Sequence, residues 1–166
     1  MIMPALYVRS PWANLIASGT KAIETRHYKP PDHVIGEWVA IIQPRCRGNP
    51  KSRVRCLAYI SGFYEYRDKQ HWADELTSHR VKSCDPDFGW KEDKPKYAWK
   101  LQMVADINDT WYWKILSGGR VWTTVQVGFR HFLETTGGYG TCSELQSSQK
   151  TMRSLIPTSL QESCEV

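Results

Sequence analysis

The sequence predicts an α+β domain built on a small, mainly antiparallel and barrel-like β-sheet, with a short helix after the first strand and one or two further helices. Between Ala5 and Val127, runs rich in apolar and β-branched residues recur, whereas helical spacing appears in only two stretches. A chain of 166 residues, 41% of them hydrophobic, can fill one core. Many strands separated by few helices are typical of the α+β class.

The first strand and the first helix are predicted close to the N-terminus. Ala5 to Val8 is a short apolar run that leads into Ser10, a good N-cap residue. Pro11 suits the first position of a helix, where its missing N–H costs nothing. Apolar residues then recur at helical spacing as far as Gly19, which can adopt the left-handed conformation that ends a helix. We therefore expect a helix of about two turns.

Two strands and two loops are predicted next. Polar and apolar residues alternate from Lys21 to Arg26, as they do in a strand with one buried face. From Glu37 to Ile42, apolar residues fall on both faces of the expected strand, which suits a strand enclosed on both sides. Tyr28 to Asp32 contains two consecutive prolines, which exclude regular sheet. Gln43 to Arg53 combines four basic residues with proline and glycine, so we expect an exposed basic loop there.

The remaining elements are predicted from composition and spacing. Aromatic and β-branched residues indicate a long strand with a bulge at Gly62. Apolar residues and a histidine at helical spacing indicate one surface helix, and a charged, proline-containing segment follows it. The expected order is a strand over Val54 to Tyr66, a helix over Asp68 to Val81, a connection over Lys82 to Lys96, and strands over Tyr97 to Val104 and Arg120 to Val127.

One domain is expected to span residues 1–133, followed by a C-terminal tail over residues 134–166. Beyond about Glu134 the composition shifts to glycine, serine, threonine and glutamine. Few apolar residues remain there to offset the entropy lost on ordering. We therefore expect a flexible tail, with at most a short helix near residues 149–156.

Charge and cysteine content narrow the class of protein. Lys and Arg number 22 against 17 Asp and Glu, so the formal net charge is +5, which favours anionic partners. The five cysteines are odd in number and lack C-x-x-C spacing, and the N-terminus does not resemble a signal peptide, so we expect a cytoplasmic protein without a disulfide framework. The apolar stretches are too short to cross a bilayer, so no membrane partner is expected.

Four motifs occur in a fixed order along the chain. They are Ser10-Pro11-Trp12-Ala13-Asn14-Leu15-Ile16, Gly19-x-Lys21-x-x-Glu24-x-Arg26, Gly36-x-Trp38-Val39-Ala40-Ile41 and Tyr97-Ala98-Trp99-Lys100-Leu101. In letters, order and spacing they resemble the motifs of ASCH domains, which are relatives of the PUA fold. The resemblance is fullest from Ala5 to Ile42 and is absent from the tail.

This resemblance implies a PUA-like β-barrel whose cleft, beside the first helix, binds RNA or a modified nucleoside, with DNA as an alternative and no cofactor. Some relatives are ribonucleases, and others are amidohydrolases that act on an N4-acylated cytidine. The latter use a lysine, a threonine and a glutamate, and the positions that match here are Lys21, Glu24 and, for the acid, Glu75 or its neighbour Asp74. A carboxylate in place of the threonine would hold the lysine protonated and suppress nucleophilic attack. Binding without catalysis is therefore favoured over hydrolysis.

The residues also support an anion-binding cleft on physical grounds. A helix that begins at Pro11 would aim unpaired N–H groups outward, and such groups attract phosphate. Trp12 and Tyr97 offer planar surfaces for stacking a base, a contact worth about 1–3 kcal/mol. The residues expected to bind nucleic acid are Ser10, Pro11, Trp12, Lys21, Glu24, Thr25, Arg26, Tyr97 and Lys100.

Structural interpretations stand beside each of these functional ones. Trp12 can plug the core, Glu24 and Arg26 can form a cross-strand ion pair without function, and the basic loop can be a solvated flap. An exposed aromatic patch at Trp111 to Trp113 would instead suit a protein partner, which makes an interaction module a further alternative. The cysteines and histidines between residues 46 and 84 lack zinc-ligand spacing, so no metal is expected.

Overall fold

The computed structural model describes residues 2–45, 51–107, 111–118 and 121–129. In this part of the chain seven strands form one sheet, accompanied by short helices. The strands are β1 (Ile2–Tyr7), β2 (Ile23–Arg26), β3 (Glu37–Gln43), β4 (Arg53–Glu65), β5 (Tyr97–Asp106), β6 (Trp111–Gly118) and β7 (Trp122–Phe129). The helices are α1 (Trp12–Ala17), η1 (Asp32–Val34), α2 (Lys69–Asp74) and α3 (Leu76–His79).

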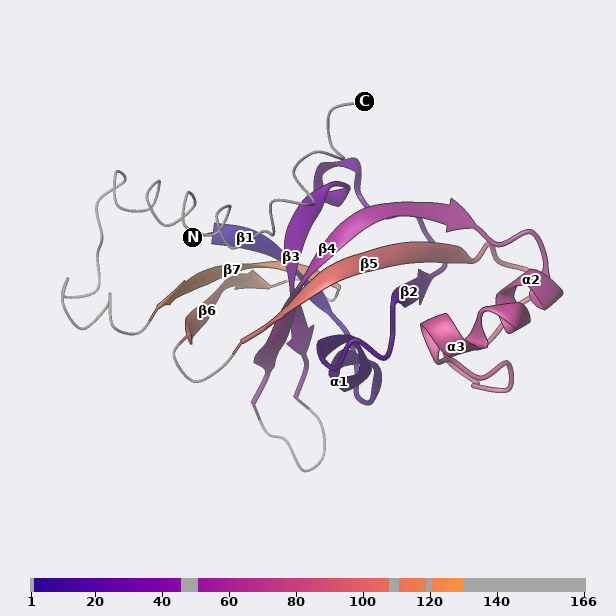
Figure 1. Cartoon of the computed structure of the whole chain (residues 1–166), viewed down its shortest axis with the longest axis horizontal. Helices are drawn as coiled ribbons and strands as arrows, with labels where there is room; N and C mark the ends of the chain where they lie inside the picture. The colour runs from indigo at the N-terminus through magenta and orange to yellow at the C-terminus, as the bar shows by residue number, and fades with distance from the viewer. Residues whose placement is uncertain (1, 46–50, 108–110, 119–120, 130–166) are drawn as a thin grey trace.

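The sheet has the strand order β2-β5-β4-β3-β1-β7-β6. The β1–β3 pair is parallel, and the other pairs are antiparallel. Figure 1 shows the strands crossing at a strong twist, with α2 and α3 at one end beside β4 and β5. The predicted α+β class and mainly antiparallel sheet are confirmed. Within the described residues β2 and β6 stand at the two edges without pairing to each other, so a closed barrel is not seen.

The long strand β4 is bent where the sequence predicts a bulge. Its pairing with β5 shifts register between Ile60 and Gly62. Gly62 has φ = +157°, a conformation that L side chains rarely adopt. β4 pairs with β3 through residues 53–60 and with β5 through residues 56–65, so the bend lies where only the pairing with β5 continues.

Helix α1 begins one position later than predicted. Pro11, not Ser10, occupies the N-cap, and its backbone is already helical. The Ser10–Pro11 peptide bond is cis. The predicted end is confirmed, because Gly19 has φ = +71° and donates its N–H to the carbonyl of Ile16 over 2.8 Å.

The single helix predicted over Asp68 to Val81 is two short helices. Asp68 caps α2 by accepting the N–H of His71 over 2.7 Å, and Glu75 then separates α2 from α3. Both helices lie at the surface as expected, with Lys69, Asp74 and Thr77 exposed, whereas Trp72 and His79 on the inner face have no exposed surface. The pair closes one end of the sheet with a small core of its own.

Strand β6 was not predicted, because its aromatic start suggested an exposed patch instead. It pairs with β7 along its length. Trp113 is partly buried and packs against the core, whereas nothing is described of the side chains of Trp111 and Tyr112. The predicted tail and its short helix lie outside the described residues, and within those residues no helix is long and apolar enough to span a membrane.

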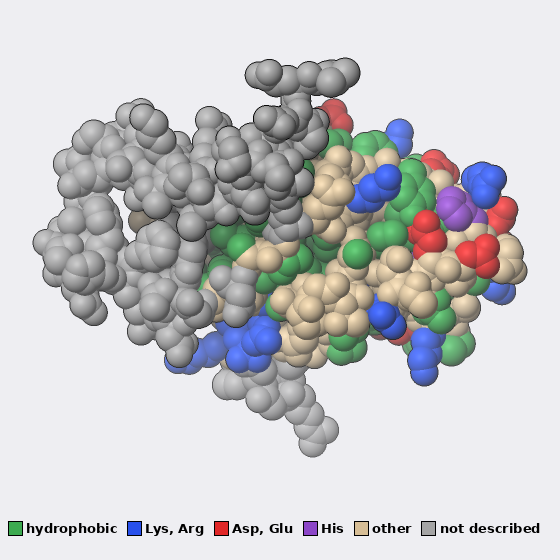
Figure 2. Space-filling view, in the orientation of Figure 1, with side chains coloured by type: hydrophobic (Ala, Val, Ile, Leu, Met, Phe, Trp, Pro, Cys, Tyr) green, Lys and Arg blue, Asp and Glu red, His purple; other side chains and the backbone are tan. Residues whose placement is uncertain are grey.

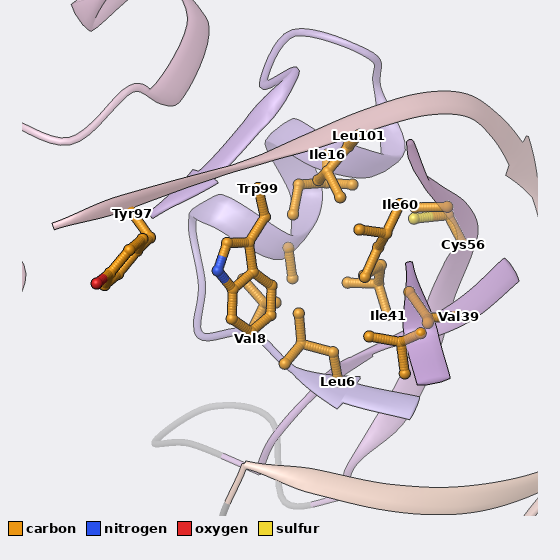
Figure 3. Packing of buried hydrophobic residues seen from close by; sticks show 13 residues of the cluster. Leu6, Val8, Ile16, Val39, Ile41, Cys56, Ile60, Tyr97, Trp99 and Leu101 are labelled. Atoms are coloured by element: carbon orange, nitrogen blue, oxygen red, sulfur yellow. The ribbon is translucent and has the colours of Figure 1, made fainter. Parts of the chain in front are cut away.

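The core lies on both faces of the sheet. One face packs under α1, and Figure 3 shows the side chains of Leu6, Ile41 and Ile60 pointing toward one another there, with the ring of Trp99 beside them. The other face has a second apolar cluster. Strand β3 contributes to both, since Val39 to Gln43 are all buried, which confirms the prediction of a strand enclosed on both sides.

Candidate nucleic-acid interface

A pocket of about 830 Å³ opens at the carboxyl ends of the parallel strands β1 and β3. Hydrogen bonds from the N–H of Tyr7 to Val121 and from the N–H of Val8 to Ile42 hold the end of β1 between its neighbours. The wall is contributed by segments from five parts of the chain. The lining residues are Tyr7, Val8, Arg9, Trp12, Glu24, Thr25, Arg26, Pro44, Arg45, Ser52, Val81, Phe88 and Val121.

Three arginines make the pocket basic. Arg9 and Arg45 are exposed, and the ion pair of Arg9 with the equally exposed Asp87 is long, at 3.8 Å. Such a surface pair contributes little, so the Arg9 guanidinium is available to a ligand. Arg26 is held more firmly, because it donates from Nη2 to the carbonyl of Tyr7 over 2.8 Å and its Nε lies 2.9 Å from Glu24 Oε1.

Beneath the pocket lies a buried chain of charges. Lys21 Nζ is 3.3 Å from Glu24 Oε2, while Arg26 contacts the other oxygen of the same carboxylate. Lys21 also donates to the carbonyls of Ile23 and His79 over 2.7 and 2.6 Å. Its side chain has no exposed surface, and burial lowers the pKa of Lys21 below its ordinary value, although Glu24 opposes that shift.

The aromatic side of the pocket is formed by Trp12 and Phe88. Their rings meet edge to face with centroids 4.8 Å apart. Trp12 Nε1 donates to the carbonyl of Arg80 over 3.2 Å, which ties α1 to the segment after α3. Arg9 lies over the Phe88 ring at 5.5 Å. Trp12 therefore lines the pocket and also packs, partly buried, against two hydrophobic clusters of the core.

The start of α1 does not offer the anion site that the sequence suggested. The N–H of Ala13 donates to the carbonyl of Arg9 over 3.1 Å, and those of Asn14 and Leu15 donate to the carbonyl of Pro11. These donors are therefore satisfied within the chain. Arginine side chains, not backbone N–H groups, supply the positive charge of the pocket.

The structure brings together some of the predicted site residues and separates others. Trp12, Glu24, Thr25 and Arg26 line the pocket, and Lys21 lies directly below it. Ser10 and Pro11 are exposed nearby but do not line it. The others lie elsewhere, and they are Tyr97, Lys100 and Glu75.

The three residues outside the pocket have other contacts. Figure 3 shows the Tyr97 ring to one side of the Trp99 group, and it packs against Phe63 at 6.4 Å. Lys100 is exposed and lies 5.4 Å over the Tyr64 ring. Glu75 accepts a hydrogen bond from the Tyr64 hydroxyl, so the structure does not place it beside Glu24.

Sequence reasoning missed Arg9, Arg45 and Phe88 as site residues. Arg9 directly precedes the Ser10-Pro11-Trp12 motif, and Arg45 belongs to the basic loop predicted over Gln43 to Arg53. Phe88 lies in a segment that was predicted to be a charged connection. The detectable signal was an apolar run, Phe88 to Trp90, inside an otherwise charged stretch, because such residues need something to pack against.

A second buried lysine lies behind the aromatic wall. Lys96 donates to the carbonyls of Phe88 and Gly89 over 2.6 and 2.9 Å and lies 5.5 Å over the Trp72 ring. Burial lowers the pKa of Lys96 to about 8. Its hydrogen bonds fix the segment that carries Phe88. Among the described residues, no three histidine, cysteine or acidic side chains gather in a way that could hold a metal ion.

Comparison with known proteins shows the fold. The crystal structure of ASCH from Zymomonas mobilis matches with a TM-score of 0.50 at 18% identity, over 60% of this chain and 66% of that one. Crystal structures of a serine-to-alanine and a tyrosine-to-phenylalanine variant of that protein give TM-scores of 0.50 and 0.52 at 19% and 18% identity. The match covers 60% and 63% of this chain and 67% and 72% of theirs.

The chain thus spans about two thirds of the length of these neighbours, and it has the fold of ASCH proteins. This likeness confirms the resemblance to ASCH domains that the four sequence motifs indicated, whereas closure of the sheet into a barrel is not shown. No family model and no curated protein matches the sequence.

Proposed function

We propose that this domain binds single-stranded RNA by taking one nucleotide into the arginine-lined pocket. The observation that carries the proposal is the convergence of Arg9, Arg26 and Arg45 on one hollow that also has an aromatic wall. Guanidinium groups pair well with phosphate, and they do so in two-point geometry. An aromatic face beside them suits an unstacked base.

The size and charge of the pocket support the proposal. A volume of about 830 Å³ lies within the roughly 300–1,000 Å³ of typical small-molecule sites. Three arginines face one glutamate among the lining residues, so the pocket carries a positive excess. Figure 2 shows a different surface at the end formed by α2 and α3, where acidic and basic side chains are mixed. The excess of arginine over glutamate among the lining residues therefore supports the pocket, and not the end formed by α2 and α3, as the anion site.

The position of Lys21 favours binding over catalysis. Its Nζ is surrounded by Glu24 and two carbonyls and has no exposed surface. A nucleophile must reach the substrate, and a lysine in this position cannot do so without breaking all three contacts. Glu75 is outside the pocket as well. The residues present therefore suit recognition of a nucleotide better than cleavage of one.

The experiment is the salt dependence of binding. A labelled ten-nucleotide single-stranded RNA is titrated with the protein at several NaCl concentrations, and its fluorescence anisotropy gives the dissociation constant. Each phosphate contact contributes a slope of about −0.7 to log K against log salt for a single strand, so the two exposed arginines, Arg9 and Arg45, predict about −1.4, since Arg26 is already paired with Glu24. Replacing Arg9 and Arg45 together by alanine should lower the affinity and remove about 1.4 from the magnitude of the slope.

The matched control is Arg67→Ala, since Arg67 is exposed and does not line the pocket. It should leave both the affinity and the slope close to those of the unmodified protein. A flat salt profile, or an equal effect of all three alanine substitutions, would contradict the proposed role of the pocket.

A further inference from the structure

The carboxylate of Glu24 is an unusual group to find in a basic pocket. It lines the hollow, yet its side chain is only 8% exposed and lies between two cations. Lys21 contacts Oε2 and Arg26 contacts Oε1, so these two cations hold both carboxylate oxygens in position. Among the lining residues it is the acidic one. A negative group kept at the surface of an anion site calls for a specific reason.

Both oxygens retain hydrogen-bonding capacity. An ionised carboxylate offers about four lone-pair sites, and the two cations use one on each oxygen. The fixed carboxylate can therefore accept two further hydrogen bonds from one planar ligand.

The two kinds of charge have different places in the pocket. Arg9 and Arg45 are exposed and stand at its rim, whereas Glu24 is buried. A ligand that satisfies both must carry an anionic group at one end and hydrogen-bond donors at the other. A nucleotide has this arrangement, because its phosphate is anionic and the Watson–Crick edge of some bases carries donors.

The four RNA bases differ in what they offer a carboxylate. Guanine presents two adjacent donors, N1–H and the N2 amino group, which match two carboxylate oxygens. Cytosine and adenine present one amino group beside an acceptor nitrogen. Uracil presents N3–H between two carbonyl oxygens, which a carboxylate repels. Base-edge contacts of this kind discriminate by about 1–3 kcal/mol.

We infer that Glu24 is the specificity-determining residue of the pocket, which selects guanine, takes cytosine and adenine less well, and rejects uracil. The inference rests on the proposed function, since it assigns the base that the nucleotide pocket recognises. Arg26 and Lys21 act as positioning residues, because they hold the carboxylate in place. Trp12 and Phe88 supply the faces against which the base lies.

The test measures the dissociation constants of GMP, CMP, AMP, UMP and IMP by isothermal titration calorimetry. GMP should bind at least about tenfold more tightly than UMP. IMP, which has the guanine edge without the N2 amino group, should lie between them. Equal affinities for GMP, IMP and UMP would overturn the inference while leaving the nucleotide pocket intact. Failure of every nucleotide and of RNA to bind would overturn both.

Two variants locate the effect. Glu24→Gln keeps the shape but replaces one acceptor oxygen by an amino donor that can pair with a uracil carbonyl, so the ratio of GMP to UMP affinity should fall to within about threefold. Arg45→Ala should weaken all five ligands by a similar factor and leave the ratio unchanged, because phosphate contacts carry no base information. A ratio that changes with Arg45 and not with Glu24 would refute the assignment.

Glu24 also partners Lys21, so the folding of Glu24→Gln is checked by thermal unfolding before ligands are added. If that variant does not fold, the comparison of GMP with IMP on the unmodified protein decides the question alone. IMP as tight as GMP would then count against two-point recognition.

Discussion

A lysine without exposed side-chain surface lies at the centre of this site. Sequence reasoning treated Lys21 as a residue that contacts ligand, because its motif and its charge point to the cleft. The structure places it one layer deeper, where it contacts Glu24 and the carbonyls of Ile23 and His79. Lys21 therefore contributes to the pocket indirectly, because it fixes the carboxylate of Glu24 on β2 relative to the carbonyl of His79 at the end of α3.

Replacing Lys21 by methionine should destabilise the fold strongly. The change leaves two buried carbonyls without a donor and a buried carboxylate with one cation in place of two. Breaking a buried pair by removing one partner costs about 3–5 kcal/mol, and the free energy of unfolding in urea should fall by that amount. Lys69→Met, at an exposed lysine of α2, should change it by less than about 0.5 kcal/mol. Similar small effects of both would show that Lys21 is not paired as described.

At the residue scale, the site could be predicted where sequence position alone brings side chains together. Glu24 and Arg26 are two residues apart on a strand, so their side chains lie on the same face and close together. Arg45 and Phe88 reach the same pocket from other elements, and that meeting depends on the sheet order. No local pattern contains this information.

The α2–α3 element is organised around a neutral histidine. His79 Nδ1 accepts the N–H of Val81 over 3.1 Å, so Nε2 carries the proton that is shared with the carbonyl of Trp72 over 2.7 Å. Its ring stacks on Trp72 with centroids 4.5 Å apart. Burial lowers the pKa of His79, and Lys21 and Lys96 act in the same direction. A second proton would displace the Val81 hydrogen bond.

Stability should therefore fall as the pH drops below about 6.5. The unfolded chain binds a proton on this histidine with an ordinary pKa near 6.5, whereas the folded chain binds it only at lower pH, so acid favours the unfolded state. The melting temperature, followed by circular dichroism from pH 7.5 to pH 5, should decline over that window.

The histidine responsible is identified by comparing variants. His79→Gln should melt lower at pH 7.5 but show a shallower decline, because the titrating group is gone. His33→Gln, at an exposed histidine of η1, should reproduce the slope of the unmodified protein. A slope that is unchanged in His79→Gln would assign the acid sensitivity to another group, of which His27 is the first candidate, since burial lowers its pKa too.

At the element scale, prediction succeeded where a position requires a backbone conformation that few residues other than glycine adopt. Gly19 ends α1 and Gly62 marks the bend in β4, both through backbone angles that other residues avoid. Prediction failed at β6, where two tryptophans and a tyrosine in a row suggested a surface patch. Of the three residues at helical spacing in the predicted helix, Trp72 and His79 are fully buried but Leu76 is 44% exposed, because the helix is interrupted between them.

The whole molecule depends on its first strand. β1 lies between β3 and β7 in the sheet, so it links the N-terminal region of the chain to the last strand described. Ala5 and Leu6 have no exposed surface. This arrangement, with its parallel β1–β3 pair, could not be derived from strand positions alone, because the sequence indicates strands but not their partners.

Two truncations should have opposite effects. We propose that residues 134–166 are not needed for the fold, because their composition offers little apolar surface to bury. A chain that ends at residue 133 should unfold cooperatively and bind RNA as the full chain does. A chain that lacks residues 1–7 should lose the cooperative transition in circular dichroism, since it removes the strand between β3 and β7. Loss of folding in the first truncation would show that the tail belongs to the domain.

The tie between Trp12 and the carbonyl of Arg80 has a consequence for the energetics of recognition. The lining residues come from parts of the chain that are far apart in the sequence, around Tyr7, Glu24, Arg45, Phe88 and Val121, so the unfolded chain has no partial version of the pocket. Occupancy and global folding are therefore linked by mass action, and a ligand at one hundred times its dissociation constant adds about 2.7 kcal/mol to the stability. If the pocket binds a nucleotide as proposed, a cell that supplied that nucleotide would also protect this protein from degradation.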